Sequence, residues 1–104
     1  MSHQINGRYI NEFGDAYWYK NGLFHREDGP AVECSDGDKY WYKNALKHRE
    51  DGPAIERWNG KKEWWINDVQ YTEDEFNQWL AKKHLNEKLH STLEEKSEVK
   101  KVKI

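Results

Sequence analysis

Short runs of aromatic and aliphatic residues alternate with polar ones along most of the chain, and the pattern recurs at a fixed interval. A tryptophan stands every 23 residues, at Trp18, Trp41 and Trp64. Segments 14–36 and 37–59 are identical at 16 of their 23 positions, and a decayed third copy covers residues 60–71. Residues 1–13 form a partial copy. A period of this length is typical of stacked supersecondary units, each of which buries its apolar side against its neighbours.

Turn dipeptides predict how each copy folds. Asp36-Gly37 and Asn59-Gly60 favour two-residue type I′ hairpin turns, because both central positions of such a turn need a positive φ. Phe13-Gly14 holds the equivalent place one copy earlier. Counting outward from these turns sets an apolar residue opposite a tryptophan in three successive hairpins. The predicted pairs are Tyr9 with Trp18, Val32 with Trp41, and Ile55 with Trp64.

Side chains alternate between the two faces of a strand, so these pairs predict two unlike faces. The tryptophan face is expected to form the core. The other face is expected to present rings that bind a partner, because Tyr and Trp bury a large area at low entropic cost. These candidate partner-binding residues are Tyr17, Tyr19, Tyr40, Tyr42 and Trp65. In the alternative interpretation, a C-terminal helix covers this face and the rings belong to the core.

The end of the third copy predicts a change to helix. The first two copies close with HREDGP, whereas the third continues into a segment where Thr72 and Glu75 form a capping-box pair. A capping helix is expected over residues 72–84, covering a sheet face or an open edge. Residues 85–104 are expected to form a second, charged helix or a disordered tail. The predicted fold class is mainly β: a single twisted antiparallel sheet of successive hairpin repeats with a C-terminal helix or helical pair.

Charge and composition narrow the classes of partner. The chain has 104 residues, of which 35% are charged, and a formal net charge of -2, so neither duplex nucleic acid nor an anionic membrane is expected as a partner. Six Trp, six Tyr and three Phe predict a largely aromatic core. Cys34 is the single cysteine, which excludes an intramolecular disulfide and favours the cytoplasm. Neither secretion nor membrane insertion is expected, because the chain has no long apolar stretch.

The repeat resembles a known family. An aromatic residue followed by K-N-G at 19–22, then His25 and the closing Asp36-Gly37, are similar to MORN repeats. The string W-Y-x-N-G-x-x-H-R-E-D-G-P-A, which begins at Trp18, resembles more closely a divergent MORN-like variant found in bacterial and bacteriophage proteins. It has H-R-E-D-G-P where ordinary units have H-G-x-G, and the second copy has Ala45 at the turn glycine. The resemblance implies a scaffold for protein contacts, without shared catalytic residues, in a small phage or bacterial protein of the cytoplasm.

Each full copy also carries a His-Arg-Glu-Asp string with candidate chemistry. An acid, a base and a cation at consecutive positions favour general acid–base catalysis or phosphate binding. Neighbours along a chain point in different directions, so we expect the four groups to hold the loop rather than to converge on one atom. The candidate ligand-binding residues are His25, Arg26, His48 and Arg49. No metal site is expected, because Tyr71 replaces the histidine in the third copy, and Cys34 lacks a spaced histidine partner for nucleophilic catalysis.

Three classes of function remain. The first is a non-enzymatic interaction protein whose aromatic sheet face or edge binds a partner protein; in a phage product, the partner would be a host protein or defence complex that it inhibits. The second is a module that binds a small nucleotide-like anion through the arginines and tyrosines of the repeats. The third, an enzyme, needs an acid–base pair in a pocket that repeat symmetry does not supply. No cofactor is predicted, and a homodimer is an open alternative.

Overall fold

The strands and the helix of this protein belong to two separate units. A computed structural model describes residues 5–102, with side chains to residue 89. The first unit, Met1–Glu73, is built of short antiparallel strands, and the second, Asp74–Ile104, is helical. The fold is therefore mainly β, as predicted, with an open antiparallel sheet and a single helix within the part of the chain that is described.

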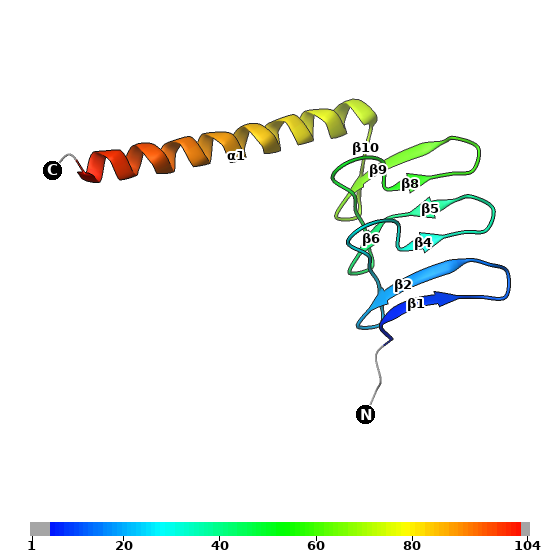
Figure 1. Ribbon diagram of the computed structural model, residues 1–104. Coiled ribbons are helices and arrows are strands. Elements are labelled where there is room, and N and C mark those ends of the chain that lie inside the picture. Colours follow the sequence, from blue (N-terminus) through cyan, green and yellow to red (C-terminus); the bar gives the residue numbers. More distant parts are fainter. Residues whose placement is uncertain (1–4, 103–104) are drawn as a thin grey trace. The chain divides into compact units, whose positions relative to one another are not determined.

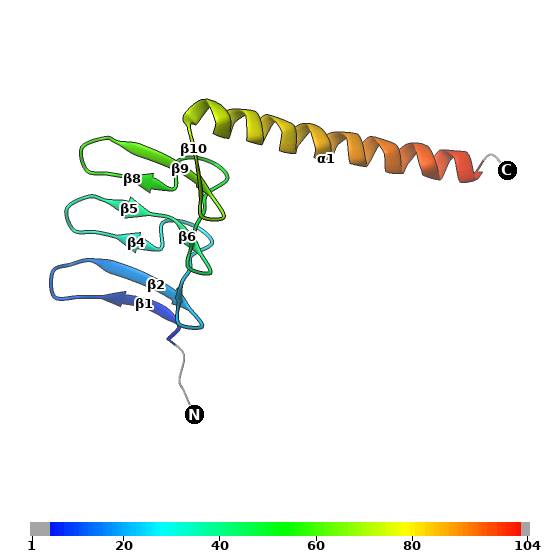
Figure 2. The same cartoon turned by 180° about the vertical axis from the view of Figure 1, so that it is seen from behind.

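Long and short hairpins alternate along the first unit. The long hairpins pair β1 (Gly7–Ile10) with β2 (Ala16–Lys20), β4 (Val32–Glu33) with β5 (Lys39–Tyr40), and β8 (Ile55–Glu56) with β9 (Lys62–Ile66). The short hairpins pair β2 with β3 (Leu23–Phe24), β6 (Tyr42–Lys43) with β7 (Leu46–Lys47), and β9 with β10 (Val69–Tyr71). Successive long hairpins join through β2 with β4 and β5 with β8, so the order across the sheet is β1-β2-β4-β5-β8-β9-β10. Figures 1 and 2 show the long hairpins side by side, with their tips along one margin of the unit and the short turns along the other.

The tight turns lie in the short hairpins, at asparagines. Asn21-Gly22, Asn44-Ala45 and Asn67-Asp68 have positive φ at both positions. The flanking residues pair directly across each turn, as Lys20 does with Leu23. Positive φ at both central residues of a two-residue loop is the mark of a type I′ turn. The type I′ turns therefore occur at the Asn dipeptides and not at Asp36-Gly37 and Asn59-Gly60, where the sequence predicts them.

The loops of the long hairpins are one residue longer than predicted. The N–H of Cys34 donates to the carbonyl of Asp38 at 2.8 Å, and the N–H of Gly37 donates to the carbonyl of Cys34 at 3.0 Å. Gly37 has a φ of 107°. A turn closed in this way and followed by a glycine with positive φ is the common three-residue hairpin loop with a bulge. Arg57 closes the next loop through the equivalent pair of bonds.

The longer loop shifts the register of each long hairpin by one residue. The observed pairs are Tyr9 with Tyr17, Val32 with Tyr40, and Ile55 with Glu63. The predicted pairing of these residues with Trp18, Trp41 and Trp64 is wrong. A shift by one residue turns every side chain of one strand to the opposite face, because side chains in a strand alternate with a period of two.

The buried aliphatic residues consequently lie on both faces of the sheet: Val32 and Ile55 share a face with the tyrosines, whereas Ala16 and Ile66 share a face with Trp18 and Trp64. Val32 and Ile55 are 7% and 3% exposed, and Val32 lies between Tyr17 and Tyr40 of the neighbouring strands. Trp18, Trp41 and Trp64 are half-buried, as are Tyr17 and Tyr40. The tryptophan face therefore carries part of the core, whereas the sequence predicts the whole core there, and among the described residues no large side chain is fully buried. The buried apolar residues of the first unit are Ala16, Ala31, Val32, Ala54, Ile55 and Ile66.

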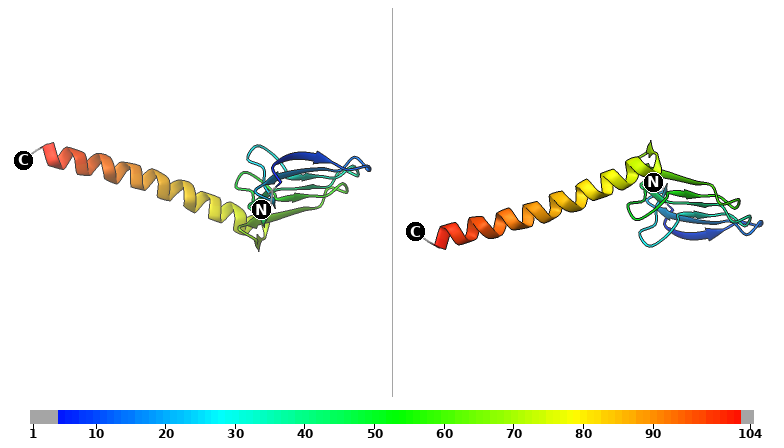
Figure 3. Two further views of the ribbon diagram at one scale, coloured as in Figure 1. Left: turned by 90° about the horizontal axis from the view of Figure 1, so that it is seen from below. Right: turned by 90° about the horizontal axis from the view of Figure 1, so that it is seen from above.

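Hydrogen bonds tie each long hairpin to the next near the tips. Oδ1 of Asp15 accepts from the N–H of Ser35 at 2.7 Å, and Oδ1 of Asp38 accepts from the N–H of Trp58 at 2.8 Å. The backbone hydrogen bond of Ser35 is the first cause of a lowered pKa at Asp15. Figure 3 looks along the stack from below and from above and shows the hairpins of successive copies lying over one another. The carboxylates therefore fasten neighbouring copies in this stack.

The second unit is one helix, α1 (Glu73–Val102). It begins directly after Thr72, where the capping-box pair predicts a start. At Leu85, where the sequence predicts a change to a second helix or a tail, the helix continues without a break, since the segment from Glu73 to Val102 has no glycine or proline to end it. The last predicted tail residues, 103–104, lie outside the described part of the chain. No helix among the described residues is long and apolar enough to cross a membrane.

Candidate functional site

Contacting aromatic rings run across the tyrosine-bearing face of the sheet. We call this surface the aromatic face and define it by Tyr9, Tyr17, Tyr19, Phe24 and Tyr42. Phe24 contacts Tyr19 at a ring-centroid distance of 5.2 Å and Tyr42, one copy further on, at 5.3 Å. Tyr9 contacts Tyr19 at 5.7 Å with the rings edge to face. Aromatic pairs at such distances attract one another beyond the effect of the area that they bury. The rings of successive copies thus form one continuous surface.

The aromatic face is partly open to solvent. Tyr9 is 49% exposed, and the other four rings are half-buried. Burial raises the pKa of the Tyr42 hydroxyl, and burial together with the carboxylate of Asp15 raises the pKa of Tyr17. At neutral pH these hydroxyls are therefore protonated and can donate hydrogen bonds. The face combines apolar ring area with polar tips, the combination found at many protein interfaces.

The chemistry of this surface changes in the next copy. Lys47 stands where the preceding copy has Phe24, and its Nζ lies 4.2 Å from the ring centre of Trp65. Trp65 in turn stands where the preceding copy has Tyr42. A cation–π contact therefore replaces the Phe24–Tyr42 ring contact at the equivalent position. The surface continues across the copies with a positive charge added.

Tyr40 and Trp65 are linked by a charged network on the same side of the sheet. The guanidinium of Arg57 donates to the hydroxyl of Tyr40 at 3.3 Å and to Glu63 at 3.0 Å. The indole N–H of Trp65 donates to Glu63 at 3.1 Å. Burial and the nearby Asp38 raise the pKa of Tyr40. This network holds the two rings in place at the edge of the aromatic face.

All five predicted partner-binding residues thus lie on one side of the sheet, but two further members were missed. The predicted register places Tyr9 on the tryptophan face. Phe24 lies outside the hairpin strands that the turn dipeptides predict, although it forms the bridge between two copies. Phe24 and Tyr42 are replaced by Lys47 and Trp65 one period later. One joint replacement among several differing positions does not predict a contact, so the sequence carries no sufficient signal for this bridge.

The first His-Arg-Glu-Asp loop is braced by its arginine. Nε of Arg26 donates to Asp28 at 2.9 Å, and Nη1 donates to the carbonyl of Pro30 at 3.1 Å. The guanidinium carbon lies 3.9 Å from the ring centre of Trp18. A Cβ atom added to Gly29 would lie 2.9 Å from that same carbon. The arginine therefore closes the loop on itself and stacks on the tryptophan, and a side chain at position 29 would force its guanidinium to shift.

The second loop repeats this geometry with a shorter additional ion pair. The guanidinium carbon of Arg49 lies 4.0 Å from the ring centre of Trp41. Its Nη1 reaches Glu56 at 2.9 Å, whereas Arg26 reaches Glu33 at 3.5 Å. Guanidinium groups that are bonded to carboxylates and stacked on rings in this way are held firmly. Neither arginine has its charge free for a ligand.

The loop histidines are buried and use both ring nitrogens. His25 is 8% exposed. Its Nδ1 accepts from the backbone N–H of Asn44 at 3.0 Å, so the proton is on Nε2, which donates to Glu27 at 2.7 Å. The hydrogen bond from His25, with a smaller effect of Lys43, lowers the pKa of Glu27. His48 makes the same two bonds, to the N–H of Asn67 at 3.0 Å and to Glu50 at 2.8 Å.

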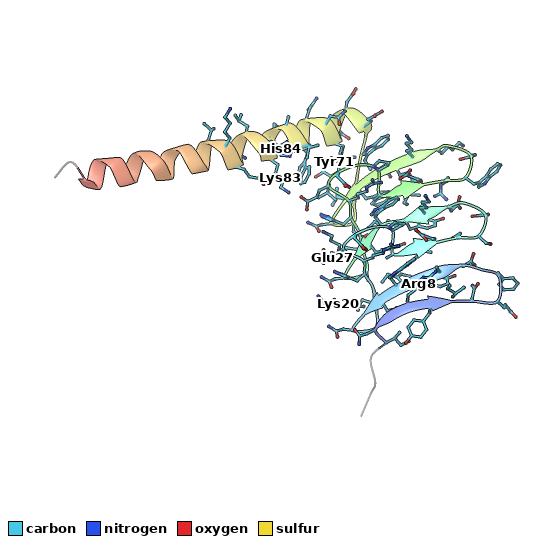
Figure 4. All side chains as sticks on the ribbon, in the orientation of Figure 1. Arg8, Lys20, Glu27, Tyr71, Lys83 and His84 are labelled. Atoms are coloured by element: carbon cyan, nitrogen blue, oxygen red, sulfur yellow. The ribbon has the colours of Figure 1, made fainter. Side chains whose placement is uncertain are left out.

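A groove of about 510 Å³ separates the two loops. It is lined in part by Trp41, Arg26 and Arg49, and also by four carboxylates and Lys43. Figure 4 shows one of these carboxylates, Glu27, at the margin of the sheet that carries the short turns. The charged lining residues comprise three cations and four anions. The structure therefore brings three of the four candidate ligand-binding residues to one groove, but with a charge that does not favour an anion.

Among the described residues, neither Cys34 nor a metal cluster provides a reactive centre. Burial, followed by the effect of Asp15, raises the pKa of the Cys34 thiol. A thiol with a raised pKa is a poor nucleophile at neutral pH, because the thiolate is the reactive form. In the described part of the chain, no group of three or more His, Cys, Asp and Glu side chains could hold a metal ion.

No family model, no curated protein and no solved structure matches this chain.

Proposed function

We propose that this chain is a non-enzymatic scaffold, built from MORN-like hairpin repeats, that binds a partner protein through its aromatic face. The observation that carries the proposal is the unbroken ring contact from Tyr9 through Tyr19 and Phe24 to Tyr42. It joins successive copies into one surface that is only half-buried. Clustered tyrosine rings with few rotatable bonds are typical of binding hot spots.

The loop chemistry supports a scaffold over an enzyme. A general base needs an unshared electron pair within reach of a substrate proton. In His25 the Nδ1 lone pair is occupied by the N–H of Asn44, and Nε2 donates to Glu27. The guanidinium of Arg26 is likewise engaged by Asp28 and by the carbonyl of Pro30. These groups hold copies and loops together, which leaves the aromatic face as the surface for binding.

The partner that fits best is a protein of the cytoplasm. A single cysteine, which has no partner for an intramolecular disulfide, suits a reducing compartment. The MORN-like string favours a bacterial or phage origin, so the expected partner is a host protein. In a phage protein, the function that we propose for such a small scaffold is inhibition of a host enzyme or defence complex.

The experiment compares the two faces of one sheet. The tagged chain captures proteins from a bacterial lysate, alongside a Tyr19→Ala/Tyr42→Ala variant and a Lys39→Ala/Lys62→Ala control. The two lysines lie in the ladder of the opposite face, where Lys39 is opposite Glu33 and Glu56. We expect one stoichiometric partner with the wild type and the lysine control, and its loss with the tyrosine variant.

Each variant is first checked for folding by thermal unfolding. Capture of the same partner by a folded Tyr19→Ala/Tyr42→Ala variant would exclude the aromatic face. Loss of capture by the lysine control alone would assign binding to the opposite face.

A further inference from the structure

We propose that two copies of this chain pair through the outer edge of β1, antiparallel to each other, with Tyr9 of one copy opposite Tyr9 of the other. The proposed site is a strand edge, and the occupant is a second copy. The proposal stands apart from the function of the aromatic face, because it uses the backbone of β1 and not the rings of Tyr19 and Tyr42.

Among the described residues, β1 leaves unpaired the edge through which its counterparts β4 and β8 pair with a second strand. Within each long hairpin, β1, β4 and β8 hold the same place. The strand β4 pairs with both β2 and β5, and β8 pairs with both β5 and β9. Among the described residues, β1 pairs with β2 alone. All four of its residues are exposed, and an unpaired edge is a template for another strand.

The hydrogen-bond pattern identifies the groups that this edge offers. The N–H of Trp18 donates to the carbonyl of Ala31 at 2.8 Å, which directs it away from β1. Trp18 lies opposite Arg8, so this pair is one that does not exchange hydrogen bonds. Because such pairs alternate with bonded ones along an antiparallel ladder, Tyr9 bonds inward and its two neighbours point outward. The outer edge therefore presents the N–H and C=O groups of Arg8 and Ile10.

These groups form a self-complementary set. With a twofold axis at Tyr9, each Arg8 meets Ile10 of the second copy and exchanges both backbone hydrogen bonds with it. The two Tyr9 rings then face each other in a pair without hydrogen bonds, where side chains approach most closely. The ring contacts of Tyr9 would thereby continue into the second copy. With the axis at Arg8 instead, two guanidinium groups would lie opposite each other, which is unfavourable.

The exposed side chains at this edge agree with such an occupant. Ile5, Tyr9 and Ile10 are 46%, 49% and 55% exposed. Natural sheets protect their edges with charged side chains, proline, bulges or short strands; β1 is short and carries Arg8, but it has neither lysine nor proline in Gly7-Arg8-Tyr9-Ile10. One short strand from each copy buries much less than the roughly 1,600 Å² of a standard interface. The dimer is therefore expected to be weak, with a Kd of about 10 µM to 1 mM.

Sedimentation equilibrium of the full chain tests the pairing through the charge at position 10. In the proposed register Ile10→Glu places a carboxylate opposite Arg8 of the second copy, and Ile10→Lys places an ammonium there. Each contact occurs twice, so the Kd of the Glu variant should be lower than that of the Lys variant by about tenfold. Val69→Lys is the matched control, since Val69 lies in the other edge strand, β10, and is 56% exposed.

Two results would overturn the proposal. One is a wild-type chain that stays monomeric up to about 1 mM, the upper end of the Kd range expected for a small interface. The other is an equal Kd for Ile10→Glu and Ile10→Lys, since only the Tyr9 axis sets position 10 opposite Arg8. An independent check uses Tyr9→Cys in a Cys34→Ser background, which should form a disulfide-linked dimer on mild oxidation, whereas Val69→Cys should not. A Tyr9→Cys chain that remains folded and uncrosslinked would also contradict the pairing.

Discussion

His25 accepts, at Nδ1, a hydrogen bond from the backbone N–H of Asn44, 3.0 Å away and one copy further along the chain. His48 and Asn67 repeat this bond at the same distance. Each imidazole is buried, and its other nitrogen is bound to a glutamate. The histidines of the His-Arg-Glu-Asp loops are therefore structural links that hold the tight turn of the following copy.

Loss of the imidazole should destabilise the repeats. His25→Ala leaves the N–H of Asn44 without its acceptor and opens a small cavity, at a cost of about 2 kcal/mol of unfolding free energy. His25→Asn retains an oxygen close to the position of Nδ1 and should cost about half as much. Urea unfolding followed by tryptophan fluorescence measures both variants. Equal losses would show that the bond to Asn44 contributes nothing.

Ala45 is a site where a single substitution should stabilise the protein. It has a φ of 66°, in the left-handed region that a side chain disfavours, and the equivalent position in the preceding copy is Gly22 with a φ of 77°. Ala45→Gly should raise the unfolding free energy by about 1 kcal/mol. The matched control, Gly22→Ala, should lower it by a similar amount. An Ala45→Gly variant that is less stable than the wild type would contradict this account of the turn.

The two kinds of turn explain why the repeats could be predicted from the sequence and the register could not. Asp36-Gly37 fits a two-residue type I′ turn and also a three-residue loop that ends on glycine, since both need glycine at positive φ. The difference is one residue, and it decides whether Val32 lies opposite Trp41 or Tyr40. The residues of the turn dipeptide alone do not decide between the two-residue and the three-residue loop. It depends on how successive hairpins pair and on the carboxylates that link their tips.

Those members of the candidate site that depend only on alternation within one strand could be predicted from the sequence. Tyr17 and Tyr19 are two residues apart and share a face in any register. Tyr9 joins them only through the correct pairing of β1 with β2, and Phe24 only through contact with the next copy. The sequence predicts that the arginines hold their loops, because neighbouring charges cannot converge on one ligand atom. Their stacking on Trp18 and Trp41 depends on tertiary structure and was not predictable.

Gly52 and Arg49 should be energetically coupled. A Cβ atom on Gly52 would lie 3.0 Å from the guanidinium carbon of Arg49, so the guanidinium must shift over the Trp41 ring. Gly52→Ala should therefore cost about 1 kcal/mol of unfolding free energy in the wild type, through weakened stacking and hydrogen bonds. In an Arg49→Ala background the same change should cost less than about 0.5 kcal/mol. A double-mutant cycle of urea unfolding measures the coupling, and additive losses would exclude it.

Alkaline pH should loosen the aromatic face. Burial raises the pKa of Tyr42 above its ordinary value of 10.0, with Tyr40 as a smaller cause. The folded state therefore favours the protonated ring, so its contribution to stability is complete below about pH 10 and is lost as the pH rises through the raised value. Tyr42→Phe removes this contribution, and its stability should decline less steeply above about pH 10. Urea unfolding at a series of pH values, with tyrosinate absorbance recorded in parallel, provides the comparison; identical slopes for the two proteins would contradict the burial of Tyr42.

Binding of a partner protein to the aromatic face is tested most directly by site-specific photocrosslinking in the captured complex. A benzophenone-bearing phenylalanine replaces Tyr42 in one variant and Lys39, on the opposite face, in another. Crosslinks to the partner from position 42 and none from position 39 are the result expected here. Crosslinks from position 39 alone, or equally from both, would contradict the assignment of binding to the aromatic face.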